Sequence, residues 1–317
     1  MTFRFLRTLA LIPLAAWLLD AQTAQVNGPV TGFVFDQAAR ALRPILGLPG
    51  ASTFGDPVAL GYDLAAAYVS PRQDAALAVG TDGTLHFLRI DGGAVAEKQV
   101  DSLATSPDHV VFSPSGKGAA ISAGGSIELL KGLPDSPMVA GGIDLSSGTK
   151  LNSLALSDDG AVLLVSTGNA VRLFGSLSDM GKLMDTAGPA LLAFAAGGHD
   201  AAVVHAAGSG ITLFHDLTGA GGSQVLAPVD DTISASSALA FSADGKSLLV
   251  ASSQGQSVTA FDLTAGARNS IACSCSPKTL AAMGNLFRLN ELGADPVWLL
   301  DAQASQPRVL FVPALAQ

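Results

Sequence analysis

Short runs of apolar residues recur along the chain, separated by polar turns rich in Gly, Asp and Ser. The recurring unit is an apolar strand that ends at a small residue, a tight polar turn and a second apolar strand, as in residues 239–251. Four copies are clear and two are worn. Their equivalent positions lie 38 to 47 residues apart and are occupied by Ser70, Ser113, Ser157, Ala195, Ser242 and Met283. A fixed period of this length indicates a repeat architecture.

Each unit continues with further strands. The second strand is apolar on both faces, as in residues 161–165, which predicts burial on both sides. A fourth, weaker strand ends the unit, for example residues 94–100 or 308–312. The third strand recurs in seven copies, at residues 32–35, 85–88, 127–130, 171–174, 211–214, 258–261 and 297–300. An Asp suited to a turn often follows the third strand, at Asp36, Asp216, Asp262 and Asp301.

Four strands per unit, turns rich in Gly and Asp, and no helical periodicity predict an all-β fold, a β-propeller with four-stranded antiparallel blades. We expect seven blades. The N-terminal segment shows only a third and a fourth strand, residues 32–36 and 42–46, so the first blade is incomplete. The alternative is a six-bladed ring with this hairpin added to one blade. The loop 47–63 has room for a degenerate strand.

The motif at residues 241–246, Phe-Ser-Ala-Asp-Gly-Lys, with Phe261 and Asp262 after it, resembles the WD-repeat-like and YVTN-type bacterial β-propellers. The resemblance covers roughly residues 30–313. No Trp-Asp dipeptide occurs in the repeats, so eukaryotic WD repeats fit poorly. Members of this broad group include binding scaffolds as well as lactonases and other hydrolases, so the resemblance implies a fold and leaves the function open.

The N-terminus has the pattern of a signal peptide. Arg4 and Arg7 precede an apolar run over residues 9–19, too short to span a bilayer, and small residues follow. We expect cleavage after Ala21, or anywhere from 21 to 24. The expected organisation is a signal peptide over residues 1–21 and one propeller domain over 22–317, exported to the periplasm or the cell exterior. An uncleaved anchor and a buried helix are the alternatives.

Composition and charge exclude some classes of protein and of partner. The 317 residues are 49% hydrophobic and only 14% charged, which excludes extensive disorder. The net charge of −9 argues against nucleic acid and anionic membranes as partners. The N-terminal run is the one long apolar stretch, so we do not expect a protein integral to the membrane.

The two cysteines, Cys273 and Cys275, are two residues apart. On a strand they share a face at a Cα separation near the upper limit for a disulfide. We expect plain buried thiols, with a strained disulfide as the first alternative and redox or metal chemistry as the second. Zinc needs four ligands, which two thiolates do not supply.

Few residues in the sequence suggest a catalytic or metal-binding role. None of the histidines has metal-ligand spacing within one strand, and we expect structural roles for them. His205 and His215 fall on successive strands of one blade, where the pattern allows them to be cross-strand neighbours. Asp158, Asp159 and Gly160 form the turn of one repeat. The five histidines are His86, His109, His199, His205 and His215.

Acidic residues collect in the loops that enter the first strands, and such loops ring one mouth of a propeller channel. Carboxylates there are suitable ligands for Ca²⁺, although solvated loop charge is the simpler interpretation. These residues are Asp56, Asp63, Asp101, Asp108, Asp144, Asp230 and Asp231.

The sequence contains no Gly-x-Ser-x-Gly elbow, zinc-protease motif, Walker loop or dinucleotide fingerprint. We therefore assign no catalytic, cofactor-binding or metal residue and no cofactor. The leading hypothesis is a non-catalytic scaffold that binds a protein, a polymer or a small ligand at one mouth of the ring. The alternatives are a lactonase-like hydrolase or lyase with dispersed channel residues, and a self-associating cell-surface module.

Overall fold

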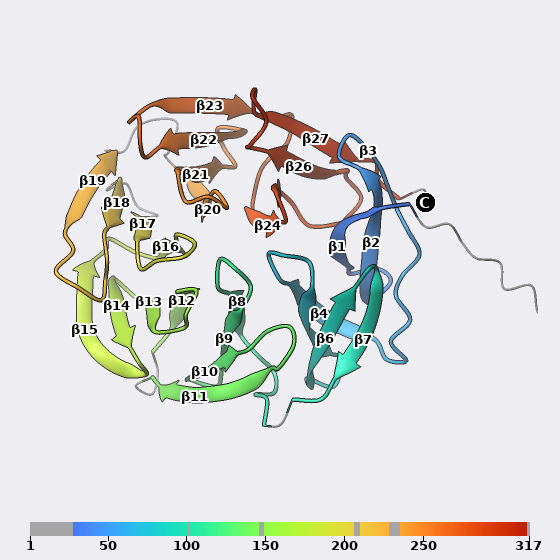
Figure 1. The fold of residues 1–317 in the computed structure, drawn as a ribbon, viewed down its shortest axis with the longest axis horizontal. Coiled ribbons are helices and arrows are strands. Elements are labelled where there is room, and N and C mark those ends of the chain that lie inside the picture. The colour runs from blue at the N-terminus through green and yellow to red at the C-terminus, as the bar shows by residue number, and fades with distance from the viewer. Residues whose placement is uncertain (1–27, 101, 146–148, 206–209, 228–234, 316–317) are drawn as a thin grey trace, which may run out of the picture.

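The protein is a ring of seven antiparallel sheets, as Figure 1 shows in a view along the ring axis. The structure is a computed structural model, and it describes residues 28–100, 102–145, 149–205, 210–227 and 235–315. These residues form 27 strands and no helix. The prediction of a seven-bladed propeller is confirmed. The predicted signal peptide, residues 1–21, lies outside the described residues.

The first three blades come from the N-terminal half of the chain. Blade 1 contains β1 (Val30–Asp36), β2 (Ala41–Leu48) and β3 (Ala51–Phe54). Blade 2 contains β4 (Leu64–Val69), β5 (Ala75–Gly80), β6 (Leu85–Asp91) and β7 (Ala94–Lys98). Blade 3 contains β8 (His109–Phe112), β9 (Gly118–Ala123), β10 (Ser126–Lys131) and β11 (Met138–Asp144).

Blades 4 and 5 follow with the same strand order. Blade 4 contains β12 (Leu151–Leu156), β13 (Val162–Thr167), β14 (Ala170–Gly175) and β15 (Ser178–Asp185). Blade 5 contains β16 (Ala190–Phe194), β17 (Ala201–His205), β18 (Ile211–Phe214) and β19 (Ser223–Ala227).

The last two blades complete the ring. Blade 6 contains β20 (Ser236–Phe241), β21 (Ser247–Ser252), β22 (Ser257–Asp262) and β23 (Arg268–Ala272). Blade 7 contains β24 (Ala281–Met283), β25 (Leu286–Arg288), β26 (Val297–Asp301) and β27 (Arg308–Val312). In these blades the first strand lies nearest the centre and the last lies on the rim (Figure 1).

The core lies between blades. All six residues of β5 are buried, as the two-sided apolar pattern predicted. Leu77 of blade 2 and Ile121 of blade 3 belong to one apolar cluster, and Leu164 of blade 4 and Val203 of blade 5 belong to another. Because each cluster needs two adjacent sheets, a blade cannot bury its faces alone.

The Ser of the repeat is a structural residue that closes the inner hairpin, the turn between the first and second strands of a blade. Ser157 is fully buried; its Oγ accepts from the Val162 N–H at 2.9 Å and donates to Asp159 at 2.7 Å. Ser242 makes the same pair of bonds. In blade 5, Ala195 cannot make them, and only the backbone bond to the Asp200 carbonyl remains.

Blade 1 is incomplete, as expected, and has three described strands. The segment 47–63 does contain a further strand, β3. A buried ion pair of 2.8 Å joins Arg43 to Asp36, and Arg43 also donates to the Gly55 carbonyl. Strand β1 contacts β4 and β3 contacts β27, so within the described residues the ring closes by packing, without an exchanged strand.

The expectation of free cysteines is wrong. Cys273 and Cys275 form a disulfide with a Cα separation of 5.0 Å. They lie in the connection from β23 to β24, where the chain is not in strand conformation. The strand spacing assumed from the sequence therefore does not apply. Both cysteines pack in the apolar cluster between blades 6 and 7.

The described part of the chain forms no helix with the length and apolar character needed to cross a membrane.

Candidate functional site

The inner hairpins of the blades gather around the centre of the ring on one face (Figure 1), which we call the hairpin face. Asp and Gly favour tight turns, so the polar residues of the repeat motif lie at these hairpins. Lys117, His199 and Lys246 each lie four residues after the repeat position of their blade. The repeat thus places ionisable side chains at the inner hairpins of blades 3, 5 and 6.

A cavity of about 390 Å³ opens on this face where blades 2, 3 and 4 meet. It lies between the inner hairpins of these blades and the turn that follows β10. We call it the hairpin-face cavity. Its lining residues are Arg72, Lys117, Gly118, Lys131, Gly132, Leu133, Pro134, Asp135, Asp158, Asp159 and Gly160.

The cavity lining carries three cationic side chains, Arg72, Lys117 and Lys131, and three carboxylates, Asp135, Asp158 and Asp159. Arg72 is paired with Asp74, and Asp135 is paired with Arg89 at 2.9 Å. Lys117 and Lys131 form no ion pair within the described part of the chain, so their charge is available to a ligand. The two lysines are therefore the candidate contacts of this cavity for an anionic group.

Asp158 joins three blades at the wall of the cavity. Its Oδ1 accepts from the Ser115 N–H at 2.5 Å and its Oδ2 accepts from the Gly197 N–H at 2.7 Å. Ser115 belongs to the hairpin of blade 3 and Gly197 to that of blade 5. A carboxylate has about four acceptor positions, so Asp158 retains capacity for a further donor such as water.

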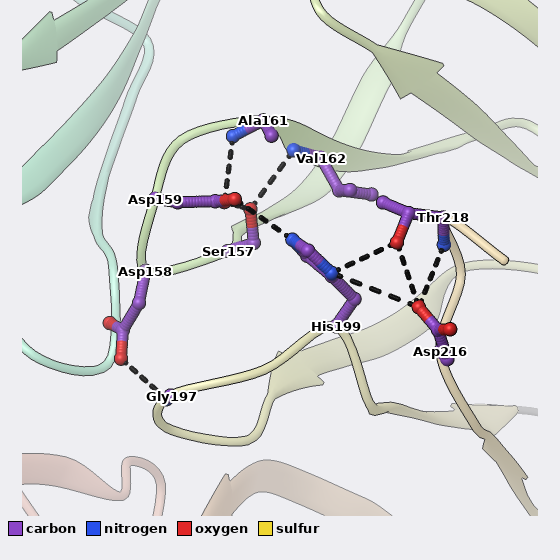
Figure 2. Close-up of polar contacts among 9 residues, drawn as sticks. All are labelled: Ser157, Asp158, Asp159, Ala161, Val162, Gly197, His199, Asp216 and Thr218. Atoms are coloured by element: carbon purple, nitrogen blue, oxygen red, sulfur yellow. Dashed lines mark hydrogen bonds and ion pairs between the residues drawn. The ribbon is translucent and has the colours of Figure 1, made fainter.

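The next residue, Asp159, points the other way, toward His199 of blade 5 (Figure 2). Its Oδ2 lies 3.0 Å from His199 Nε2, and its Oδ1 accepts from Ser157 and from the Ala161 N–H. Burial raises the pKa of this carboxyl, but the hydrogen bonds from Ala161, Ser157 and His199 outweigh it and lower the pKa to about 2. Asp159 is thus held as a carboxylate.

His199 is held on its other side as well. Its Nδ1 lies 3.1 Å from Thr218 Oγ1 and 3.8 Å from Asp216 Oδ1 (Figure 2). Thr218 also donates to Asp216 at 2.7 Å. A chain of polar contacts therefore runs from the loop after β18 across the boundary between blades 5 and 4 to the cavity wall.

The other histidines lie elsewhere. His205 and His215 are not cross-strand neighbours: Ala201 pairs with Phe214 and Val204 with Ile211, which puts them at opposite ends of the blade. His205 is buried, and burial lowers its pKa. His215 pairs with Asp200 at 3.1 Å. Two further positions are His86, which stacks on Tyr62 and pairs with Glu97, and His109 at the start of β8.

The acidic loop residues do not form a metal site in the described part of the chain. Among the described residues, no group of three or more His, Cys, Asp and Glu side chains is placed to hold a metal ion. Asp63 pairs with Arg40 at 3.6 Å. Asp101, Asp230 and Asp231 lie outside the described residues, while Asp56, Asp108 and Asp144 are described.

The cavity is not evident from the sequence. The turn role of the repeat motif explains Asp158 and Asp159 locally, and the sequence pattern predicts a structural role for His199. The available signal was a histidine at a repeat position that is lysine in two other blades: His199 occupies the place of Lys117 and Lys246. Which turns meet is decided by blade packing.

No family model and no curated protein matches the sequence. Solved structures with the same architecture do. A putative 6-phosphogluconolactonase from Bacteroides fragilis has a TM-score of 0.59 at 13% identity, over 90% of this chain and 94% of that chain. A periplasmic gluconolactonase from Pseudomonas aeruginosa has a TM-score of 0.59 at 17% identity, over 91% and 97%. A protein from Lactobacillus plantarum has a TM-score of 0.63 at 18% identity, over 89% and 95%.

The TM-scores of these matches show a shared fold. Two of the three propellers, which match this chain over about nine-tenths of its length, carry lactonase names. This finding corrects the leading hypothesis from the sequence, the non-catalytic scaffold.

Proposed function

We propose that the protein is a lactonase-type hydrolase that opens an anionic sugar lactone in the hairpin-face cavity. The observation that carries this proposal is the cavity itself, where two lysines without ion partners among the described residues lie beside the Asp158 carboxylate. The lactonase names of structures with the same fold support the reaction class.

In this proposal Lys117 and Lys131 bind the anionic group and stabilise negative charge on the substrate. Lys131 extends across the inner hairpin of blade 4; a Cβ on Gly160 would lie 3.0 Å from its Cε. Glycine at 160 therefore leaves room for the lysine. A positive charge aimed at an oxygen where charge develops lowers the barrier of an acyl-transfer reaction.

Asp158 supplies the base. Its carboxylate accepts a proton from a water molecule while the water oxygen bonds to the lactone carbonyl carbon, giving a tetrahedral oxyanion. The bond from that carbon to the ring oxygen then breaks, and the ring oxygen takes up the proton from Asp158. The product is the open hydroxy acid, and no other reactant is needed.

The test is hydrolysis of glucono-δ-lactone and its 6-phosphate by the purified protein, followed by acid release above the spontaneous rate. We expect turnover of the phosphate ester to exceed that of the uncharged lactone, because only the ester engages both lysines. Asp158→Asn should lower kcat by about 10²-fold or more. The proposal is overturned if the protein hydrolyses neither lactone faster than the spontaneous rate.

We further propose that the protein acts outside the cytoplasm, after export by the N-terminal segment, as a YVTN-type bacterial propeller would. The Cys273–Cys275 disulfide supports this location, since disulfides persist in oxidising compartments. Fractionation of cells that express the full chain, with N-terminal sequencing of the mature protein, tests both the location and cleavage at 21 to 24.

A further inference from the structure

The contacts around His199 have a feature that hairpin closure does not require. Ser157 and the Ala161 N–H already satisfy Oδ1 of Asp159, as the equivalent groups do for Asp244 in blade 6. His199 adds a bond from a different blade to the second oxygen, at 3.0 Å. The imidazole is 24% exposed and fixed at both nitrogens.

We propose that His199 is a positioning residue for Asp158: it holds Asp159 and thereby fixes the hairpin that carries Asp158 at the cavity wall. This inference rests on the proposed function. His199 itself does not line the cavity, whereas Asp158 and Asp159 both do. The two carboxylates are adjacent in one tight turn, so the orientation of one constrains the other.

The hairpin of blade 4 is anchored toward blade 5 by two bonds, Gly197 N–H to Asp158 and His199 to Asp159 (Figure 2). Without His199, the bond from the Gly197 N–H to Asp158 is the one that remains of these two bonds from blade 5. Lys117 and Lys131 belong to blade 3, and among the described residues no hydrogen bond or ion pair joins either of them to His199. Loss of the imidazole should therefore affect the step that needs Asp158 and leave anion binding unchanged.

Three variants test this separation. His199→Ala should lower kcat for the phosphorylated lactone by tenfold or more, with KM and the Kd for inorganic phosphate within threefold of wild type. His199→Gln should recover kcat to within about threefold, because its amide N–H reaches Asp159 as Nε2 does. The control is His86→Ala, which removes a histidine–carboxylate pair of 2.8 Å with Glu97 in blade 2, outside the His199 contacts; its kcat should stay within twofold.

Hydrogen exchange separates this inference from the proposed function. In His199→Ala, the Gly197 and Ala161 amides should exchange at least tenfold faster than in wild type, and in His86→Ala they should not. If wild type hydrolyses no lactone, the proposed function fails and the exchange rates alone decide. The positioning role is overturned if these amides exchange at the wild-type rate in His199→Ala. It is also overturned if His199→Ala loses kcat and phosphate affinity to the same extent.

Discussion

The carboxylate of Asp159 and the imidazole of His199 meet at 3.0 Å across the boundary between blades 4 and 5. The bond joins two inner hairpins, and neither hairpin sequence predicts the contact. It also ties the stability of this boundary to pH, because Asp159 has a pKa of about 2 in the folded protein against 3.8 for an ordinary Asp.

A depressed pKa means that the folded state holds the carboxylate more favourably than the unfolded chain does. The stabilisation is fully present above about pH 4 and is lost as the pH falls toward 2. Asp159 is about half exposed, so after solvent screening we expect about 1 kcal/mol. Asp159→Asn should lower the free energy of unfolding by this amount at pH 7 and by less at pH 3. An equal loss at both pH values would contradict the assignment.

The repeat serine should matter wherever it closes a hairpin. Ser157→Ala removes an acceptor for the Val162 N–H and a donor to Asp159, and leaves that amide buried without a partner. We expect a loss of about 1–3 kcal/mol in urea unfolding. Ser115→Ala is the control, because the Ser115 Oγ is buried with no partner among the described residues. Its removal should be neutral or stabilising.

The ion pair in blade 1 is buried, and removing one partner leaves an uncompensated charge. The side chains of Arg43 and Asp36 are 13% and 4% exposed. Arg43→Ala should therefore cost about 3–5 kcal/mol. Arg308 and Asp301 occupy the corresponding place in blade 7, but Arg308 is 61% exposed. Arg308→Ala should cost less than about 1 kcal/mol, and equal losses would contradict the burial argument.

The disulfide closes a very short loop, so its effect on the unfolded chain is small. The chain-entropy relation gives about 1.5 kcal/mol for a loop of three residues. The double variant Cys273→Ser, Cys275→Ser should show a modest fall in Tm and keep its fold, since blade packing supplies the core. Thiol titration of the unreduced, denatured protein should find no free thiol; two free thiols would show that the cysteines are unpaired.

The lysines of the cavity should act on substrate affinity. Lys117→Ala and Lys131→Ala are each expected to raise KM for a phosphorylated lactone by roughly tenfold, since a charged hydrogen bond contributes about 1.5–3 kcal/mol. Lys182 pairs with Asp185 on an exposed strand, so Lys182→Ala should leave KM unchanged. A KM that stays at the wild-type value in both cavity variants would place the anion elsewhere.

The architecture follows from local patterns in the sequence. Two-sided apolar strands such as β5 require cover on both faces, and the Ser-Asp-Gly turn closes each hairpin through bonds within six residues, as Ser157 and Val162 show. Both are local effects, and the turn bonds occur where the motif keeps its Ser and Asp, as in blades 4 and 6, and not in blade 5 with Ala195. The seven third strands therefore predicted seven blades, including the incomplete first one.

Tertiary structure alone decided the site and the state of the cysteines. Asp159 meets His199, and Asp158 meets Ser115 and Gly197, because adjacent blades are packed at one angle around the axis. That angle depends on the fit of apolar side chains between whole sheets, which no local pattern contains. Cys273 and Cys275 likewise approach each other because the β23–β24 connection leaves the strand conformation assumed for them.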